Sequence, residues 1–238
     1  MEYGLQLYSM RDIAKDDLQG ALRQAAQMGY QTIEFAGFFG HPAQEVKAWL
    51  DAYGLKAVGT HTPLDALDND FDGVVNYHHA IGCPLLTVPF ARAETQAECE
   101  AVAAKLTAYE KKLAQENITL AYHNHSFEFK TSLWEILTEQ TTLPLEVDTY
   151  WVYAAGADPI HWMETLHAQN RLPAIHIKDG LADGSGKPLG LGTAPVSAVY
   201  RTATKLQVPM LVESETLTPS GPEEARICIE YLKKLEGM

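Results

Sequence analysis

The chain has 238 residues, 46% of them hydrophobic, and its 18 basic and 31 acidic side chains give a formal net charge of −13 at pH 7. An acidic chain without a basic patch argues against nucleic-acid binding, because such proteins neutralise phosphates with Lys and Arg. There is no apolar run of eighteen residues or signal-like amino terminus, so we expect neither a membrane span nor secretion. Cys83, Cys99 and Cys228 lack metal-ligand spacing, which predicts reduced thiols and a cytoplasmic location.

Short β-rich segments alternate with helical patterns along the first half of the chain. Strands are predicted over residues 3–9, 30–37, 55–62 and 84–90, and helices over 16–29, 42–54, 71–82 and 95–117. The last of these helices begins with a capping-box pattern, Thr95 followed three residues later by Glu98. This alternation is typical of parallel strands joined by crossover helices.

The second half repeats the pattern without a linker. Strands are predicted over 118–125, 143–152, 172–179 and 208–215, and helices over 131–140, 158–168, 195–206 and 221–237. Eight units in this length predict the α/β class, as a single (β/α)8 TIM-barrel domain over 1–238. Within the glycine-rich stretch 180–193, the sequence "GLGT" is predicted to be a mobile loop. There is no Gly-rich phosphate-binding motif, which favours an unphosphorylated substrate.

Polar residues stand where the predicted strands end, the end of a barrel at which active sites form. They are Glu34, His61, His123, His125, Glu146, Asp148, His176, Lys178, Asp179, Glu213 and Glu215. Imidazole and carboxylate together favour Mn, Zn, Fe or Co over Ca. Asp148, His176 and Glu213 follow consecutive strands, so they are expected to be neighbours. His123 and His125 share one face of the fifth strand.

The motifs "GLQLYS", "IEFAG", "GTHT", "YHNHSFEF", "EVDTYWV", "HIKDG" and "LVESE", in this order, resemble those of the xylose isomerase-like TIM barrels. That family includes sugar epimerases, inosose dehydratase and endonuclease IV. The resemblance implies a divalent metal held by Asp148, His176, Glu213 and a ligand from the fifth strand. There an imidazole replaces the usual carboxylate. We expect His123 to be the fourth ligand, with His125 or a water molecule as alternatives.

The resemblance also implies roles around the metal. Mn is the expected ion, with Mg, Co, Zn or Fe as alternatives. Glu213 and either His123 or His125 are expected to move protons on opposite faces of the substrate. Lys178 is expected either to neutralise developing charge or to pair with Glu215 or Asp148. The expected substrate-binding residues are His61, Glu128, Trp151, Tyr8, Glu34 and Glu215, of which Glu34 is expected mainly to hold neighbouring side chains.

The resulting hypothesis is a metal-dependent isomerase or epimerase that acts on a small polyhydroxylated carbohydrate through an enediolate. A β-eliminating lyase or dehydratase acting on a keto-sugar or keto-inositol is the alternative, because a histidine can also protonate a departing hydroxyl. A DNA-repair nuclease is disfavoured by the net charge of −13. A barrel subunit whose site is completed by a partner chain, or by a second copy of this chain, is the remaining possibility.

Overall fold

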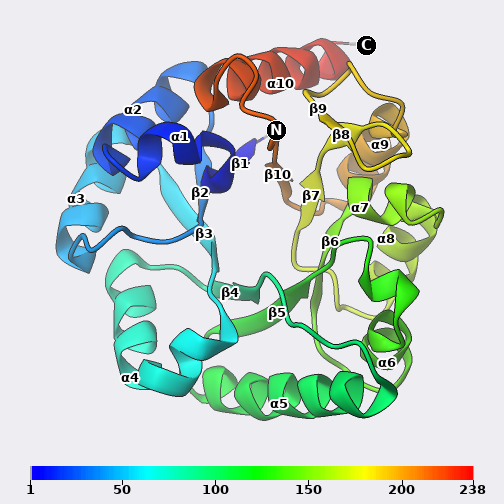
Figure 1. Cartoon of the computed structure of the whole chain (residues 1–238). Coiled ribbons are helices and arrows are strands. Elements are labelled where there is room, and N and C mark those ends of the chain that lie inside the picture. The colour runs from blue at the N-terminus through cyan, green and yellow to red at the C-terminus, as the bar shows by residue number, and fades with distance from the viewer. Residues whose placement is uncertain (1, 238) are drawn as a thin grey trace.

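Eight parallel strands close into a barrel in the computed structural model, which describes residues 2–237 (Figure 1). The strands pair in the order β1-β10-β7-β6-β5-β4-β3-β2. Their bounds are β1 Gly4–Gln6, β2 Thr32–Phe35, β3 Lys56–His61, β4 Leu85–Val88, β5 Thr119–His123, β6 Leu145–Asp148, β7 Ile175–Ile177 and β10 Met210–Val212. The predicted (β/α)8 barrel is therefore confirmed.

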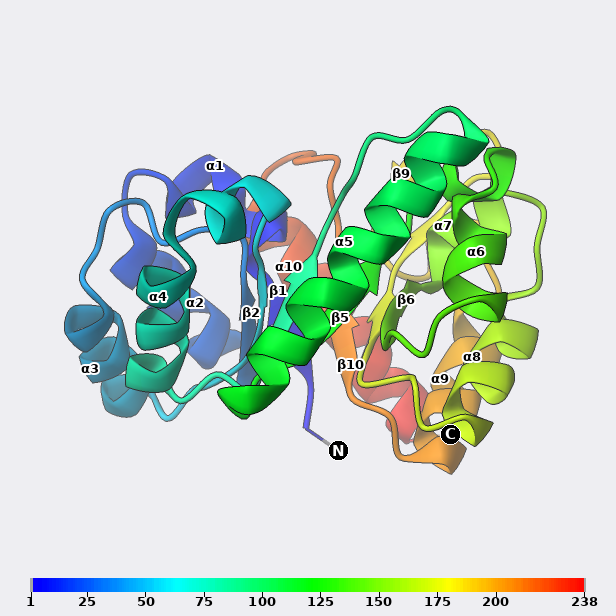
Figure 2. The same ribbon diagram turned by 90° about the horizontal axis from the view of Figure 1, so that it is seen from below.

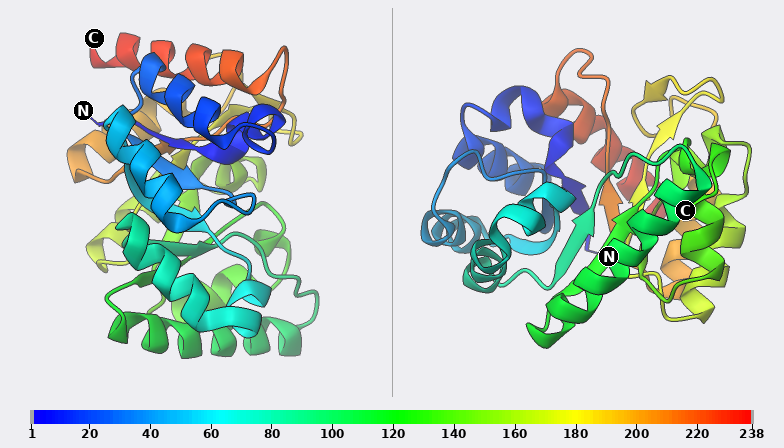
Figure 3. Two further views of the ribbon diagram at one scale, coloured as in Figure 1. Left: turned by 90° about the vertical axis from the view of Figure 1, so that its left-hand side faces the viewer. Right: turned by 60° about the horizontal axis from the view of Figure 1, so that its bottom comes forward.

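Helices surround the barrel, and both termini lie near the end at which the strands begin (Figures 2 and 3). The longer helices are α2 Leu18–Met28, α3 Ala43–Tyr53, α4 Leu64–Ile81, α5 Gln96–Gln115, α6 Leu133–Glu139, α8 Pro159–Ala168, α9 Val196–Leu206 and α10 Gly221–Glu236. The predicted capping box is present, since Thr95 Oγ1 accepts from Glu98 N and Glu98 Oε2 accepts from Thr95 N. Within residues 2–237, no helix is both long and apolar enough to cross a membrane.

The strand predicted over 143–152 is wrong in its second half. β6 ends at Asp148, and a short helix, α7 (Thr149–Ala154), follows at once. Asp148 caps this helix, because its Oδ1 accepts a hydrogen bond from Trp151 N at 2.9 Å. Trp151 therefore lies on a helix beside the barrel mouth rather than on a strand.

Three other boundaries differ from the prediction. β1 stops at Gln6, whose side chain accepts from Tyr8 N and starts the helical turns η1 (Leu7–Met10) and α1 (Arg11–Ala14). α4 begins at Leu64, ahead of the predicted residue 71, and is kinked at Asp70. The glycine-rich stretch 180–193 includes most of a short hairpin, β8 (Asp179–Gly180) with β9 (Gly186–Lys187), which was not predicted.

Strand alternation separates an apolar shell from a polar barrel interior. On β7, Ile175 and Ile177 belong to the main hydrophobic core, whereas His176 between them points to the other face. Lower in the barrel the interior is filled by a small apolar cluster: Leu85, Ala121, Ala174 and Leu211, with Val58 against it. Above this cluster the inward-facing positions are polar, and they build the candidate site. Cys83, Cys99 and Cys228 are buried free thiols.

Candidate metal and substrate site

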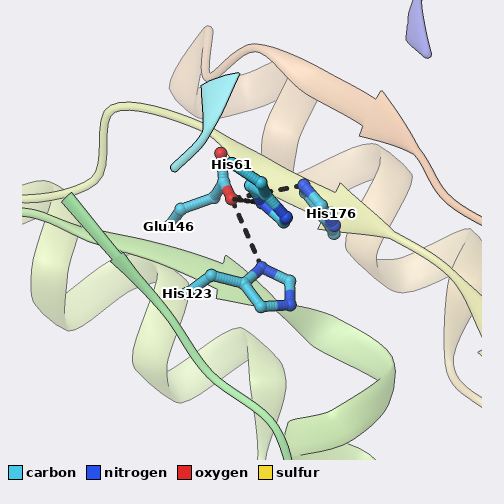
Figure 4. A group of neighbouring side chains, drawn as sticks. All are labelled: His61, His123, Glu146 and His176. Atoms are coloured by element: carbon cyan, nitrogen blue, oxygen red, sulfur yellow. Dashed lines mark hydrogen bonds and ion pairs between the residues drawn. The ribbon is translucent and has the colours of Figure 1, made fainter. Parts of the chain in front are cut away.

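Glu146 joins three imidazoles inside the barrel (Figure 4). Its Oε2 lies 3.0 Å from His61 Nε2, 3.2 Å from His176 Nε2 and 3.3 Å from His123 Nδ1. These side chains come from β6, β3, β7 and β5, and Glu146 is fully buried. Glu146 was predicted to stand at a strand end, but no role was predicted for it. Its position inside the barrel could have been predicted, because Glu146 and Asp148 are two residues apart and therefore face the same side of β6.

Glu34 lies beside this group rather than in the substrate pocket. Its Oε2 lies 2.7 Å from His176 Nε2 and accepts a hydrogen bond from Gln6 Nε2 at 2.7 Å. Glu34 is fully buried, and a Cβ at Gly59 would come within 2.7 Å of its Oε1, so this glycine leaves the space that Glu34 occupies. The geometry places Glu34 as a partner of His176, with no face open to a substrate.

A second group forms around Glu213, directly after β10. Its Oε2 lies 3.2 Å from His176 Nδ1 and 3.2 Å from Lys178 Nζ. Lys178 Nζ also lies 2.7 Å from Glu215 Oε2 and 3.9 Å from Asp148 Oδ2. The Oδ2 atom of Asp148 is buried and accepts no hydrogen bond from the part of the chain that the structure describes.

Two sets of side chains could hold a metal ion. His61, His123, Glu146 and His176 form one set and His123, Asp148, His176 and Glu213 the other; within each set the ligand atoms lie within 4.8 Å of one another. The second set has the stronger case. Glu146 Oε2 is shared among three imidazoles, whereas Asp148 Oδ2 has no hydrogen-bond partner within residues 2–237. The structure thus brings together the four predicted ligands, whose role as ligands stays a prediction.

The imidazoles and carboxylates shift one another's pKa values in opposite directions. Burial disfavours a charged His176, but Glu146 and Glu34 outweigh it and raise the pKa of His176 well above its usual value. Burial, together with the charge of His176, lowers the pKa of His123 well below its usual value. His123 is therefore neutral at pH 7, the form in which imidazole binds a metal. Metal binding at His176 would instead release a proton.

The two carboxylates of the second set, Asp148 and Glu213, also have pKa values that are shifted in opposite directions. Burial raises the pKa of Asp148 to about 7, although the Lys178 ammonium opposes this. Burial also disfavours the charged form of Glu213, but Lys178 and His176 hold the pKa of Glu213 well below its usual value. Burial would lower the pKa of Lys178, and the three carboxylates around it instead raise that pKa. Glu213 and Lys178 are thus a charged pair.

A pocket of about 480 Å³ opens above these groups at the barrel mouth. It is lined by Tyr8, Ala36, Gly37, His61, Pro63, Pro89, Phe90, His123, His125, Glu213 and Glu215. Among the predicted substrate-binding residues, Tyr8, His61 and Glu215 therefore line it. A larger cavity of about 570 Å³ lies at the opposite end of the barrel, between the starts of the strands, but its lining lacks a comparable group of ionisable side chains. The pocket at the mouth is therefore the candidate site.

His125 borders this pocket and Glu128 lies behind it. The His125 side chain is 30% exposed, and burial lowers its pKa to about 4, which leaves a neutral imidazole at pH 7. Glu128 is fully buried, and its oxygens accept from Tyr122 Oη at 2.9 Å and from the backbone N of His125 at 2.8 Å. Glu128 was expected to bind substrate hydroxyls. In the structure both of its oxygens instead hold the loop that carries His125.

Trp151 and Lys178 lie behind the pocket lining. Lys178 Nζ is 4.8 Å from the centre of the Trp151 ring, and this ring is 5.9 Å from that of His125. Neither residue lines the pocket, and Lys178 is 1% exposed. Their expected contacts with substrate stay predictions.

A family model described as a xylose isomerase-like TIM barrel matches residues 22–235 of the chain. A shorter stretch is 34% identical over 77 residues to the 2-oxo-tetronate isomerase of Haemophilus influenzae; this match covers 25% of the chain and 30% of the length of that curated relative.

Solved structures resemble the whole barrel. A sugar phosphate isomerase/epimerase from Parabacteroides distasonis has a TM-score of 0.83 and 22% sequence identity over 98% of both chains. The IolI protein, crystallised with a bound zinc atom, has a TM-score of 0.78 and 13% identity over 99% of this chain and 98% of its own. At these identities the two structures show the shared fold alone.

Proposed function

Because the chain belongs to the xylose isomerase-like TIM barrel family, we propose that it is a divalent-metal-dependent isomerase or epimerase that moves a proton next to a carbonyl group. Its substrate is a small polyhydroxylated carbohydrate. The observation that carries the proposal is the convergence of His123, Asp148, His176 and Glu213 beneath a pocket at the barrel mouth.

The four side chains fit a divalent transition metal. Two imidazoles and two carboxylates are a donor set that suits Mn, Zn, Fe or Co, and Asp148 Oδ2 is a buried acceptor without a donor in the described chain. Glu146 would support the site from behind, since its contact with Nδ1 of His123 leaves Nε2 as the ligand atom. Mn is our first choice of ion. A bound divalent cation would polarise the carbonyl of the substrate.

Glu213 and His125 are the groups that we assign to proton transfer. Both line the pocket, and both are in the basic form at pH 7, because Lys178 and His176 keep Glu213 ionised and burial keeps His125 neutral. One of them removes the proton next to the carbonyl and, once protonated, delivers that proton to the neighbouring atom, while the other is the corresponding base on the opposite face of the substrate. Lys178 limits the build-up of negative charge through its contact with Glu213.

Chelation and solvent exchange test this proposal together. We expect EDTA to abolish turnover of an unphosphorylated ketose or sugar-acid substrate, and Mn to restore it. The product formed in deuterated water should carry deuterium at one carbon by NMR, without loss of water. Full turnover after exhaustive metal removal would contradict the proposal. Release of water with formation of an unsaturated product would replace isomerisation by β-elimination, in which the proton that Glu213 or His125 has taken from carbon passes to the departing hydroxyl.

A further inference from the structure

The glycine-rich segment after β7 wraps around the carboxylate of Asp179. Oδ1 of Asp179 accepts hydrogen bonds from Gly180 N at 2.8 Å and Ala194 N at 3.2 Å, and Oδ2 accepts from Gly190 N at 2.9 Å and Gly192 N at 3.0 Å. Asp179 is 2% exposed. One internal carboxylate thus takes four backbone N–H groups.

The same four amides have the character of an anion-binding cradle. Converging backbone N–H groups on a glycine-rich loop bind phosphate in many proteins. Gly192 must lack a side chain here, because a Cβ would lie 2.2 Å from Asp179 Oδ1, and Gly190 has a positive φ of 84°. In this chain the cradle is already filled by a side chain, so an external anion has no access to it.

The cradle lies next to the candidate site. Tyr150 Oη donates to Leu181 O at 3.1 Å, and a Cβ on Gly184 would lie 3.9 Å from the Trp151 ring, so the loop packs against α7 beside the mouth. Loops after the seventh and eighth strands are where (β/α)8 barrels frequently bind a substrate phosphate.

The loop after the eighth barrel strand, β10, offers no other group of free backbone amides that could bind a phosphate. At the N-terminus of α10, Gly221 N donates to Asp12 Oδ2 at 3.0 Å and Glu223 N donates to Ser220 Oγ at 3.4 Å. Pro222, between them, has no N–H group. The chain's own side chains therefore occupy the free amides at this position too.

We propose that Asp179 is a specificity-determining residue: it fills the phosphate position of the barrel with an internal carboxylate and thereby restricts the enzyme to substrates without a phosphate group. The inference rests on the proposed function for the identity of the substrate as a carbohydrate. That Asp179 occupies the cradle does not depend on which reaction the protein catalyses.

Inorganic phosphate is the probe, titrated calorimetrically into the full-length chain with EDTA present so that phosphate cannot bind through a metal. We expect the wild type to show no saturable binding at phosphate concentrations up to about 10 mM. We expect Asp179→Ala to bind phosphate with a Kd at least about tenfold below that limit. Sodium chloride at equal ionic strength should not reproduce the effect. Asp183→Ala is the matched control, because Asp183 is an exposed carboxylate of the same loop whose Oδ1 accepts from Ser185 N at 2.8 Å.

Two results would overturn the proposal. One is saturable binding of phosphate to the wild type below about 1 mM. The other is a folded Asp179→Ala variant, judged by circular dichroism, that binds phosphate no better than Asp183→Ala. If Asp179→Ala does not fold, the wild-type titration decides the matter, with Asp179→Asn as the second variant.

Turnover then separates this inference from the proposed function. For any ketose that the Mn-loaded enzyme converts, kcat/KM should exceed that of its terminal phosphate ester by about tenfold or more. Preference for the ester overturns the inference and leaves the isomerase standing. Absence of turnover with every carbohydrate contradicts the proposed function, while the phosphate titration still decides the role of Asp179.

Discussion

His123 and His125 stand two residues apart, yet their environments assign them different roles. The His123 ring lies 4.8 Å from that of His61 and 4.5 Å from that of His176, and its Nδ1 faces Glu146. It is 1% exposed, whereas 30% of the His125 side chain is exposed at the pocket. The buried ring is suited to hold a metal, and the ring at the pocket is suited to move a proton.

Paired substitutions distinguish these two roles. We expect His123→Asn to weaken Mn binding by at least about tenfold, because it removes one of the four ligands. We expect His125→Asn to leave Mn affinity unchanged and to lower kcat by about a hundredfold or more. Calorimetry with Mn and steady-state kinetics provide the measurements. The reverse pattern, with Mn affinity lost in His125→Asn alone, would transfer the ligand role to His125.

At the scale of the secondary-structure elements, Arg171 connects two segments that support β6. Its guanidinium donates to Leu137 O at 2.6 Å and Thr138 O at 2.8 Å near the end of α6, and to Leu143 O at 3.0 Å just before β6. Arg171 is 7% exposed. These carbonyl groups have little access to water, so the guanidinium satisfies acceptors that solvent cannot.

Removing this guanidinium should cost stability without touching the site chemistry. We expect Arg171→Met to lower the free energy of unfolding by about 2–3 kcal/mol, because buried carbonyl acceptors lose charged donors. Urea denaturation measures the change, and Arg201→Met at an exposed position of α9 is the control. Equal stability of the two variants would show that the carbonyl groups find other donors.

The loop between β5 and α6 should contribute a pH-dependent stability through Glu128. Burial raises the pKa of Glu128 from 4.5 to about 7, so between these pH values the folded chain holds a proton that the unfolded chain has lost. Stability from this group is therefore full below pH 4.5 and falls as the pH rises towards 7. Glu128→Gln mimics the protonated form and lacks this dependence.

The measurement is the difference in unfolding free energy between wild type and Glu128→Gln, in EDTA, across this pH range. As the pH rises, we expect the unfolding free energy of Glu128→Gln to increase relative to that of the wild type by up to about 3 kcal/mol. Glu139→Gln, at an exposed position on α6, is the control and should run parallel to the wild type. A pH-independent difference for Glu128→Gln would contradict the assigned pKa.

The local sequence pattern was sufficient to predict the strands and helices of the barrel, but not the residues at which they end. Strand and helix periodicity predicted all eight units, because each strand carries an apolar face towards the helices. It extended β6 beyond Asp148, since "TYWV" has strand-like composition and the capping contact from Asp148 Oδ1 to Trp151 N is a property of the folded turn. The hairpin of β8 and β9 was missed because each strand has only two residues.

The sequence was enough to predict which residues stand at the strand ends of the candidate site, but not which of their side chains contact one another. Side-chain alternation and strand order were enough to bring Asp148, His176 and Glu213 together. The partners of Glu146 come from three other strands, and the four amides around Asp179 come from residues 180–194, so both depend on tertiary geometry. The burial of Glu128 depends on tertiary geometry in the same way, because it follows from the Tyr122 and His125 contacts, and its role in substrate binding stays a prediction.

At the scale of the whole molecule, apolar side chains are exposed around the barrel mouth. The large ones are Tyr8 at 43%, Phe39 at 45%, Phe90 at 51% and Leu191 at 62% exposure, and all four follow the ends of barrel strands. The expectation of a second copy or a partner chain stays a prediction, which light scattering of the purified chain measures.

The net charge of −13 is matched by the lining of the mouth pocket. The lining of the mouth pocket contains Glu213 and Glu215 but neither Lys nor Arg, so the field there repels a phosphate backbone. We expect the same field to disfavour a phosphorylated ligand.

Anomalous diffraction from Mn-soaked crystals tests the central assignment most directly. We predict one strong peak inside the barrel, about 2.0–2.3 Å from a ligand atom of each of His123, Asp148, His176 and Glu213. A barrel without an anomalous peak after soaking, or a peak held by other side chains with Asp148 and Glu213 turned away from it, would contradict this metal site.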